Sequence, residues 1–277
     1  MRLYSLAVFS SILIFLIASS VVSAGTPSSS APSFVWTSGK PAGIHSINDY
    51  EYYNWAGYAI NSTAGTVTQV KGSWKQPAVT CPSTGDLAAA FWVGIDGLVS
   101  TTVEQTGTIA ECVNGVASYF AWYEFYPAGS VAISSVPVKP GNTISATVKY
   151  STATKKFTAT IKDVTTGKTF GTTATVSDAE RSSAEWIEEA PSSCGLVTCL
   201  YAMPDFGTAS YGKDLTSVAA TNEATISGAT KTISGFGSIA DSLTMVSYPS
   251  GTPLMAQPST LSTDGTSFTV TWVSAGP

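Results

Sequence analysis

Short runs of β-branched and aromatic residues, separated by clusters of Gly, Ser, Asn and Pro, recur along most of this 277-residue chain. Examples are Thr66–Lys75, Asn142–Tyr150 and Phe268–Val273. Runs of this kind and spacing predict the short strands of a β-sandwich or barrel. Beyond the N-terminal segment no stretch shows a convincing apolar period of 3.6 residues, so we expect an all-β fold.

The most distinct local element is a predicted hairpin. It joins Lys156–Asp163 to Lys168–Val176 through Thr165-Thr166-Gly167, where glycine supplies the positive φ that such turns require. The sequence shows no internal repeat, and the roughly 250 residues that follow the N-terminal segment are enough for one large β domain or two small ones. We therefore predict a single domain over residues 51–277.

The N-terminus predicts export. A basic residue, Arg2, precedes an apolar run that ends in Val22-Ser23-Ala24. A basic start, an apolar core and small residues at the end describe a secretory signal peptide over residues 1–24. A membrane anchor is the alternative, because the run approaches the roughly 20 residues needed to span a bilayer. We favour the signal peptide, and expect a secreted, extracellular protein in which residues 25–50 form an extended lead-in or short propeptide.

Composition narrows the classes of partner. Charged residues make up 11% of the chain, against about 25% in ordinary proteins. The formal net charge is −5 and there is no basic run, which argues against nucleic acids or anionic membranes as partners. A hydrophobic content of 44% with seven tryptophans argues against disorder. We expect a soluble monomer.

The four cysteines predict two disulfides, because the chain is expected to be exported and their number is even. Cys194 and Cys199 flank four residues and are placed to close a small loop, which leaves Cys81 to pair with Cys112. This is one of three possible pairings. No CxxC spacing is present and the only histidine is His45, so we expect neither a metal site nor a cofactor.

Two segments combine carboxylates, an amide and tryptophans. Phe91–Pro127 contains FWVGIDG, VEQTG and AWYEFYP, and Ala184–Pro191 reads AEWIEEAP. With His45 in the lead-in as the only imidazole, histidine-dependent triads and zinc enzymes are disfavoured. The chemistry indicated is that of a carboxylate and an amide.

Alternation along predicted strands gathers these residues on one surface. Successive side chains of a strand point to opposite faces. Phe91, Val93 and Ile95 therefore suit a core, and Gln105 is a candidate for the opposite face. The other residues expected on that face are Trp55, Trp92, Asp96, Trp122, Glu124 and Tyr126. A face that mixes tryptophan with carboxylate suits a concave binding site, and the alternative is a solvent face with scattered aromatics.

The pattern of AEWIEEAP is less decisive. Glu185, Ile187 and Glu189 share one face of a strand, and Trp186 and Glu188 share the other. Three glutamates in five residues are by themselves typical of a solvated edge. The pattern alone does not select a functional glutamate.

WVGIDG, QTG, WYEFYP and AEWI, in this order, resemble the motifs of the glutamic peptidases, or eqolisins, and the resemblance extends over most of the chain from Trp55 onward. It implies an antiparallel β-sandwich of two curved sheets, similar to concanavalin and jelly-roll folds. It also implies a catalytic pair of one glutamine and one glutamate, which the motifs place at Gln105 and Glu189. The residues expected to shape the substrate cleft are Trp55, Trp92, Asp96, Trp122 and Glu124.

The sequence departs from the fungal pattern at Glu188, where fungal members have an apolar residue, and at Ala190, where they have an acidic one. Glu188 is therefore the rival candidate for the catalytic glutamate. Phe120 occupies a position that is acidic in some relatives.

The resemblance implies an acid-active endopeptidase that acts on protein or peptide substrates through an activated water. Two other classes remain open. One is a β-sandwich glycoside hydrolase, in which Glu124 and Glu189 flank a sugar held on tryptophans. The other is a non-catalytic carbohydrate-binding module with a tryptophan platform. Replacement of Gln105 distinguishes them, because neither of these depends on an amide.

Overall fold

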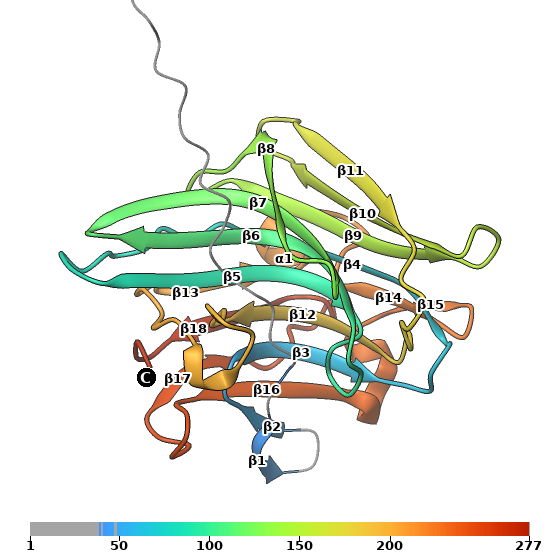
Figure 1. Cartoon of the computed structure of the whole chain (residues 1–277). Helices are drawn as coiled ribbons and strands as arrows, with labels where there is room; N and C mark the ends of the chain where they lie inside the picture. Colours follow the sequence, from blue (N-terminus) through green and yellow to red (C-terminus); the bar gives the residue numbers. More distant parts are fainter. Residues whose placement is uncertain (1–38, 40, 47–48, 277) are drawn as a thin grey trace, which may run out of the picture. The chain divides into compact units, whose positions relative to one another are not determined.

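The computed structural model describes Gly39, residues 41–46 and residues 49–276 (Figure 1). The predicted signal peptide and most of the lead-in lie outside these residues. The strands are β1 (Pro41–Ser46), β2 (Asp49–Tyr52), β3 (Trp55–Asn61), β4 (Val67–Lys75), β5 (Asp86–Ile95), β6 (Val103–Val113), β7 (Val116–Tyr126), β8 (Val131–Pro137), β9 (Thr143–Ser151), β10 (Lys156–Asp163), β11 (Thr169–Ala174), β12 (Ser183–Glu189), β13 (Thr208–Tyr211), β14 (Glu223–Ile226), β15 (Ala229–Thr232), β16 (Ala240–Val246), β17 (Leu254–Pro258) and β18 (Phe268–Trp272). Helical turns in this part of the chain are α1 (Lys213–Thr216), η1 (Val197–Cys199) and η2 (Ser234–Ile239).

The strands form one continuous, nearly closed sheet. One row of neighbours runs β8, β7, β6, β5, β12, β3 and β16, and another runs β18, β13, β4, β9, β10 and β11. Strand β17 pairs with both β16 and β18 and so joins the two rows. All these pairings are antiparallel, whereas β2 runs parallel to β16. The all-β, antiparallel prediction is confirmed. A sandwich of two separate sheets and a jelly-roll order are not confirmed, because β17 connects both rows.

The predicted hairpin is present as β10 and β11. Phe157 lies opposite Ala174, and the pairing continues to the turn without a register shift. Gly167 has φ +76° at the turn. The Asp163 side chain accepts hydrogen bonds from the backbone N–H groups of Thr165 and Thr166 at 2.9 and 3.1 Å. The carboxylate therefore satisfies two donors of the turn.

The main hydrophobic core lies on one face of β5. Phe91 and Val93 point into it, whereas Ala90 and Trp92, at the alternate positions, point to a second and smaller cluster. Strands β4 and β9 of the other row approach the core face of β5. Burial of each large apolar side chain contributes about 1.5–3 kcal/mol. The two clusters hold different side chains, and a slip of one residue along β5 would put Trp92 on the side where Phe91 and Val93 now pack.

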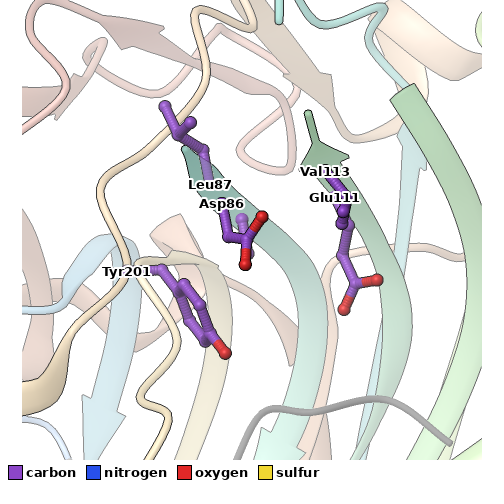
Figure 2. Close-up of a pocket in the computed structure, with 6 residues that line it drawn as sticks. Asp86, Leu87, Glu111, Val113 and Tyr201 are labelled. Carbon is purple, nitrogen blue, oxygen red and sulfur yellow. The ribbon is translucent and has the colours of Figure 1, made fainter. Parts of the chain in front are cut away.

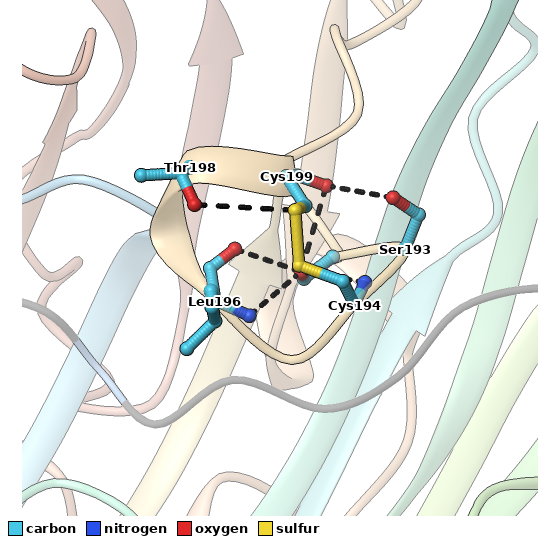
Figure 3. The surroundings of a disulfide bond; sticks show 6 residues. Ser193, Cys194, Leu196, Thr198 and Cys199 are labelled. Carbon is cyan, nitrogen blue, oxygen red and sulfur yellow. Dashed lines mark hydrogen bonds between the residues drawn. A yellow bond between two sulfur atoms is a disulfide. The ribbon is translucent and has the colours of Figure 1, made fainter.

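Two disulfides brace the chain outside the core. Cys81 pairs with Cys112 and Cys194 with Cys199, with Cα–Cα distances of 5.4 and 5.8 Å. Ser192 organises the small loop in Figure 3, because its hydroxyl oxygen accepts hydrogen bonds from the backbone N–H groups of Cys194 and Leu196 at 3.2 and 3.1 Å. The structure thus contains the two bonds in the expected pairing. Among the described residues, no helix is long and apolar enough to cross a membrane.

Candidate active site

The second cluster covers the face of the sheet opposite the main core, and is called the aromatic face below. Its buried members are Tyr52, Trp55, Ala59, Ala88, Ala90, Trp92, Leu98, Ile109, Trp122, Ile187 and Leu243. Trp55 and Trp92 meet edge to face, with ring centroids 5.0 Å apart and planes at 77°. Tyr52 stacks on Trp55 at 6.4 Å. Three of the tryptophans expected on one face are therefore together.

The register of the strands brings an amide and three carboxyl groups to this face. Four residues form a row across four neighbouring strands, each opposite the next. They are Glu124 of β7, Gln105 of β6, Gly94 of β5 and Glu185 of β12. Glu189 is four residues further along β12 and shares the face of Glu185. Directly opposite side chains in a sheet have Cβ atoms about 4.5–5.5 Å apart. The row from Glu124 to Glu185 is thus interrupted only by a glycine.

Gln105 is held by Glu124. The Gln105 Nε2 donates a hydrogen bond of 2.8 Å to the Glu124 Oε2, and both side chains are buried. Burial raises the pKa of Glu124 to about 8, although hydrogen bonds from Gln105 and the Ser130 backbone lower it. The Gln105 Oε1 is buried and has no hydrogen-bond partner among the described residues. The Nε2 end of the Gln105 amide is therefore fixed by a hydrogen bond, and its Oε1 end is available to accept one.

Glu189 is held by a tryptophan. The Trp92 indole N–H donates a hydrogen bond of 2.8 Å to the Glu189 Oε2. Burial raises the pKa of Glu189 well above its ordinary value. Hydrogen bonding by Trp92, and to a smaller extent by Trp55 and Asn54, lowers it, and the charge of Glu124 raises it. The Glu189 Oε1 lacks a hydrogen-bond partner in the described part of the chain. Glu189 and Gln105 thus each have one hydrogen-bonded atom and one acceptor oxygen without a partner among the described residues.

Glu188 belongs to the other face of β12. It follows Ile187, which lies on the aromatic face, so its side chain points toward the main core near Tyr211. Burial raises the pKa of Glu188 well above its ordinary value, and the charge of Glu189 adds to the effect. The face that carries Gln105 therefore also carries Glu189, and Glu188 is separated from it by the sheet.

Asp96 and Tyr126 lie at strand ends. Asp96 follows the last residue of β5 and has φ +73°. Its carboxylate accepts hydrogen bonds from the backbone N–H groups of Arg181 and Ser182 at 2.6 and 2.7 Å, which tie the entry to β12 to the end of β5. Tyr126 is half-buried at the end of β7, opposite Val103. Asp96 is fully buried, and its charge adds to burial in raising the pKa of Glu185 on the aromatic face.

Two glycines make room for Trp92. A Cβ atom at Gly107 would collide with the backbone of Phe91 and the side chain of Trp92. A Cβ atom at Gly94 would lie 2.9 Å from the Trp92 ring and 3.2 Å from the Gln105 Cβ. These positions were not among the predicted site residues. Their signal in the sequence is a glycine inside each of the motifs WVGIDG and QTG, where a strand interior normally avoids glycine.

The site is closed to solvent in this conformation. Gln105 is 1% and Glu189 3% exposed. Gly39 lies over part of the face, because a Cβ atom at this position would be 2.8 Å from the Trp55 ring. Its N–H donates a hydrogen bond of 3.3 Å to the Gly97 carbonyl. Access from solvent to Gln105 and Glu189 therefore requires this face to open.

A small pocket of about 30 Å³ lies further along β5 and β6 (Figure 2). Asp86 and Glu111 both contribute carboxylates to it, next to the Tyr201 ring. Burial raises the pKa of Glu111, and the charge of Asp86 adds to this effect. The pocket brings together neither an amide nor a tryptophan, and so differs from the surroundings of Gln105. In the described residues, no group of three or more His, Cys, Asp or Glu side chains is arranged to hold a metal ion.

Residues 53–255 match the Peptidase A4 family. The match covers more than half of the chain. The chain belongs to the Peptidase A4 family. It is 31% identical over 181 residues to aspergillopepsin-2 of Aspergillus niger, covering 57% of this chain and 62% of that protein. It is 35% identical over 118 residues to scytalidopepsin B of Scytalidium lignicola, covering 42% of each. The matches thus span less than two thirds of these relatives.

Solved structures support the fold of this Peptidase A4 member. A scytalido-glutamic peptidase with a transition-state analogue inhibitor aligns with a TM-score of 0.63 and 22% identity, over 80% of this chain and 98% of that one. SCP-B, an eqolisin in complex with the tripeptide Ala-Ile-His, aligns with a TM-score of 0.60 and 21% identity over the same shares. At these identities the similarity concerns the fold alone.

Proposed function

We propose that this chain is a secreted, acid-active endopeptidase that hydrolyses protein or peptide substrates with Gln105 and Glu189 as its catalytic pair. The observation that carries the proposal is their common setting on the aromatic face. Both are buried. Gln105 donates a hydrogen bond to Glu124, Glu189 accepts one from Trp92, and each keeps one acceptor oxygen without a partner among the described residues. Such acceptors suit the retention of a water molecule, and membership of the Peptidase A4 family supports a peptidase.

The mechanism uses both ends of the amide. Ionised Glu189 takes a proton from the water as its oxygen attacks the scissile carbonyl carbon. The Gln105 Oε1 orients this water, while the second N–H of Nε2, which Glu124 does not use, donates to the oxyanion. One such donor is typically worth about 3–4 kcal/mol. Protonated Glu189 then transfers its proton to the leaving amine as the C–N bond breaks.

The acidic operating range of the proposal rests on the ordinary titration range of a glutamate, and not on the closed site. Burial raises the pKa of Glu189 above the ordinary glutamate value of about 4.3. The proposal requires that water admitted to the open site returns the pKa of Glu189 toward this ordinary value, so that the ionised form is accessible at acidic pH. The protonated form becomes scarce toward neutrality, so the second proton transfer slows there.

The carbohydrate alternatives fit the site less well. In the closed conformation Trp55, Trp92 and Trp122 are fully buried and pack on one another or on neighbouring apolar side chains, so they form no exposed platform. A hydrolase with Glu124 and Glu189 as its carboxyl pair leaves the hydrogen bond between Gln105 and Glu124 without a role. Family membership also does not favour these alternatives.

Export is part of the proposal. It rests on the signal-peptide pattern of residues 1–24, followed by a single peptidase domain over residues 51–277. Two disulfides suit an oxidising compartment. We expect a monomer that binds no nucleic acid.

The test is digestion of a protein substrate by purified enzyme between about pH 2 and pH 8, with and without an aspartic-peptidase inhibitor. We expect inhibitor-resistant digestion at acidic pH that Gln105→Ala abolishes. The matched control is Gln76→Ala, which removes another buried glutamine and should retain digestion. Absence of digestion at every pH, or full digestion by Gln105→Ala, contradicts the proposal.

A further inference from the structure

Gln105 can be oriented from one side only. Among the described residues its side chain has one hydrogen bond, to Glu124. Its other lateral neighbour, Gly94, has no side chain. The Trp92 ring lies over Gly94 and offers carbon atoms there, because its indole N–H is used by Glu189. Without Glu124, no group in this row would distinguish the two ends of the Gln105 amide.

The chemistry of Glu124 decides which end of the amide faces it. An ionised carboxylate only accepts hydrogen bonds, so it selects the N–H end of Gln105. A protonated carboxyl can donate as well as accept, so it selects the same end of the amide when its proton lies on Oε1, which has no partner among the described residues, and Oε2 accepts from Gln105. The Gln105 Oε1 therefore points away from Glu124, into the space that the proposed reaction uses. An amide turned by 180° would place two donors there and no acceptor for the water.

We propose that Glu124 is a positioning residue, which fixes the orientation of the Gln105 amide and does not itself bind substrate. This inference rests on the proposed function, and it replaces the role in substrate binding that sequence similarity suggests for Glu124. The arrangement resembles the support that other side chains give to catalytic histidines, whose ring orientation depends on a carboxylate behind them.

Replacements of Glu124 that differ in hydrogen bonding test the inference. Glu124→Met removes the acceptor and preserves much of the volume, whereas Glu124→Gln keeps a carbonyl oxygen for the Gln105 N–H. We expect kcat to fall about 100-fold in Glu124→Met with KM within about twofold, because misplacement of a catalytic group costs about this much. Glu124→Gln should restore kcat to within about fivefold of wild type.

A double-mutant cycle separates positioning from other roles. If Glu124 acts through Gln105, Glu124→Met should cause no further loss of activity in the Gln105→Ala background. Additive losses would show that Glu124 acts independently, and a selective rise in KM in Glu124→Met would show that it binds substrate; either result overturns the inference. Glu104→Met is the matched control, because Glu104 is equally buried but precedes Gln105 on the opposite face of β6.

A measurement that needs no activity separates this inference from the proposed function. The chain contains four glutamines, so selective ¹⁵N labelling gives four side-chain amide groups, and Gln105→Ala identifies the relevant one. In wild type and Glu124→Gln we expect slow exchange of one Gln105 amide proton, and at least tenfold faster exchange in Glu124→Met. Equal exchange in all three proteins overturns the positioning role. Slow exchange in an enzyme that digests nothing would overturn the peptidase proposal but leave the hydrogen bond established.

Discussion

Adjacent glutamates of β12 point to opposite faces of the sheet and should respond differently to the same substitution. Glu189 shares the aromatic face with Trp92, whereas Glu188 points toward Tyr211 and the core. We expect Glu189→Gln to lower kcat about 10²–10⁴-fold, the usual contribution of a general acid–base group. Glu188→Gln is the matched control and should keep activity near wild type.

Peptide-cleavage kinetics, with circular dichroism to verify the fold, distinguish the two variants. Loss of activity in Glu188→Gln with near-normal activity in Glu189→Gln would assign the catalytic role to the other glutamate. Such a result would also require the strand to shift by one residue, which the pairing of β12 with β3 and β5 opposes.

Single-residue patterns predict the faces of this site but not its hydrogen bonds. Alternation assigns Trp92 to its observed face because β5 continues through it to Ile95. It does not apply to Asp96, which lies beyond the strand end with a positive φ. The partners of Gln105 and Glu189 are 19 and 97 residues away in the chain. They depend on the register between strands, which a pattern within one strand does not contain.

At the level of the strands, the close approach of β5 and β6 depends on Gly107. A methyl group there would collide with the Phe91 backbone and the Trp92 side chain. We expect Gly107→Ala to lower the free energy of unfolding by about 1–3 kcal/mol through overpacking, and to displace the Trp92 indole from Glu189. Thermal melts and tryptophan fluorescence measure both effects.

Gly171→Ala is the control for this substitution. Gly171 also lies inside a strand, β11, but a Cβ atom there would be 3.6 Å from the nearest side-chain atom, an ordinary contact. Its melting temperature should stay near or above that of wild type. Equal destabilisation by both substitutions would mean that loss of glycine in a strand, and not contact with Trp92, causes the effect.

Strand existence is easier to predict here than strand partnership. The β10–β11 hairpin follows from a local pattern and a turn glycine. The joining of the two rows of strands depends on β17, which pairs with β16 across a register shift between Met245 and Val246. Nothing in the local sequence of either strand indicates that pairing, so two separate sheets were expected where one continuous sheet is found.

For the molecule as a whole, buried carboxyl groups should make stability greatest in acid. The pKa values of Glu104, Glu124, Glu185, Glu188 and Glu189 are all raised, chiefly by burial, to about 9 for Glu104 and about 8 for Glu124. Unfolded glutamates titrate near 4.3. Between the unfolded and the folded pKa values, the folded state binds more protons than the unfolded state. The free energy of unfolding therefore falls as pH rises through this range.

Melting temperatures between about pH 3 and pH 9 test this expectation. We expect a maximum at acidic pH and a decline through neutrality, and Glu104→Gln should reduce the decline. Asp264 has the opposite effect on stability, because its pKa is lowered. Partial burial raises this pKa, but hydrogen bonds from Ser262, Thr266 and Ser267 outweigh it and hold the pKa below its ordinary value. The contribution of Asp264 to the free energy of unfolding is lost only as pH falls below the ordinary aspartate pKa of about 3.9. A maximum at neutral or higher pH contradicts the prediction.

The incomplete closure of the sheet has a consequence for aggregation. Strands β8 and β11 end the two rows and approach each other without pairing, and Tyr123 stacks on Phe170 across the gap at 5.7 Å. Unpaired strand edges recruit strands from other molecules. A pocket of about 260 Å³ lies between these edges, lined by Tyr123 of β7, Val131 of β8 and Thr172 of β11, so the stacking of Tyr123 on Phe170 is the contact that holds them near each other. Loss of the contact between Tyr123 and Phe170 would expose both edges together, and fibre growth would then begin at this seam.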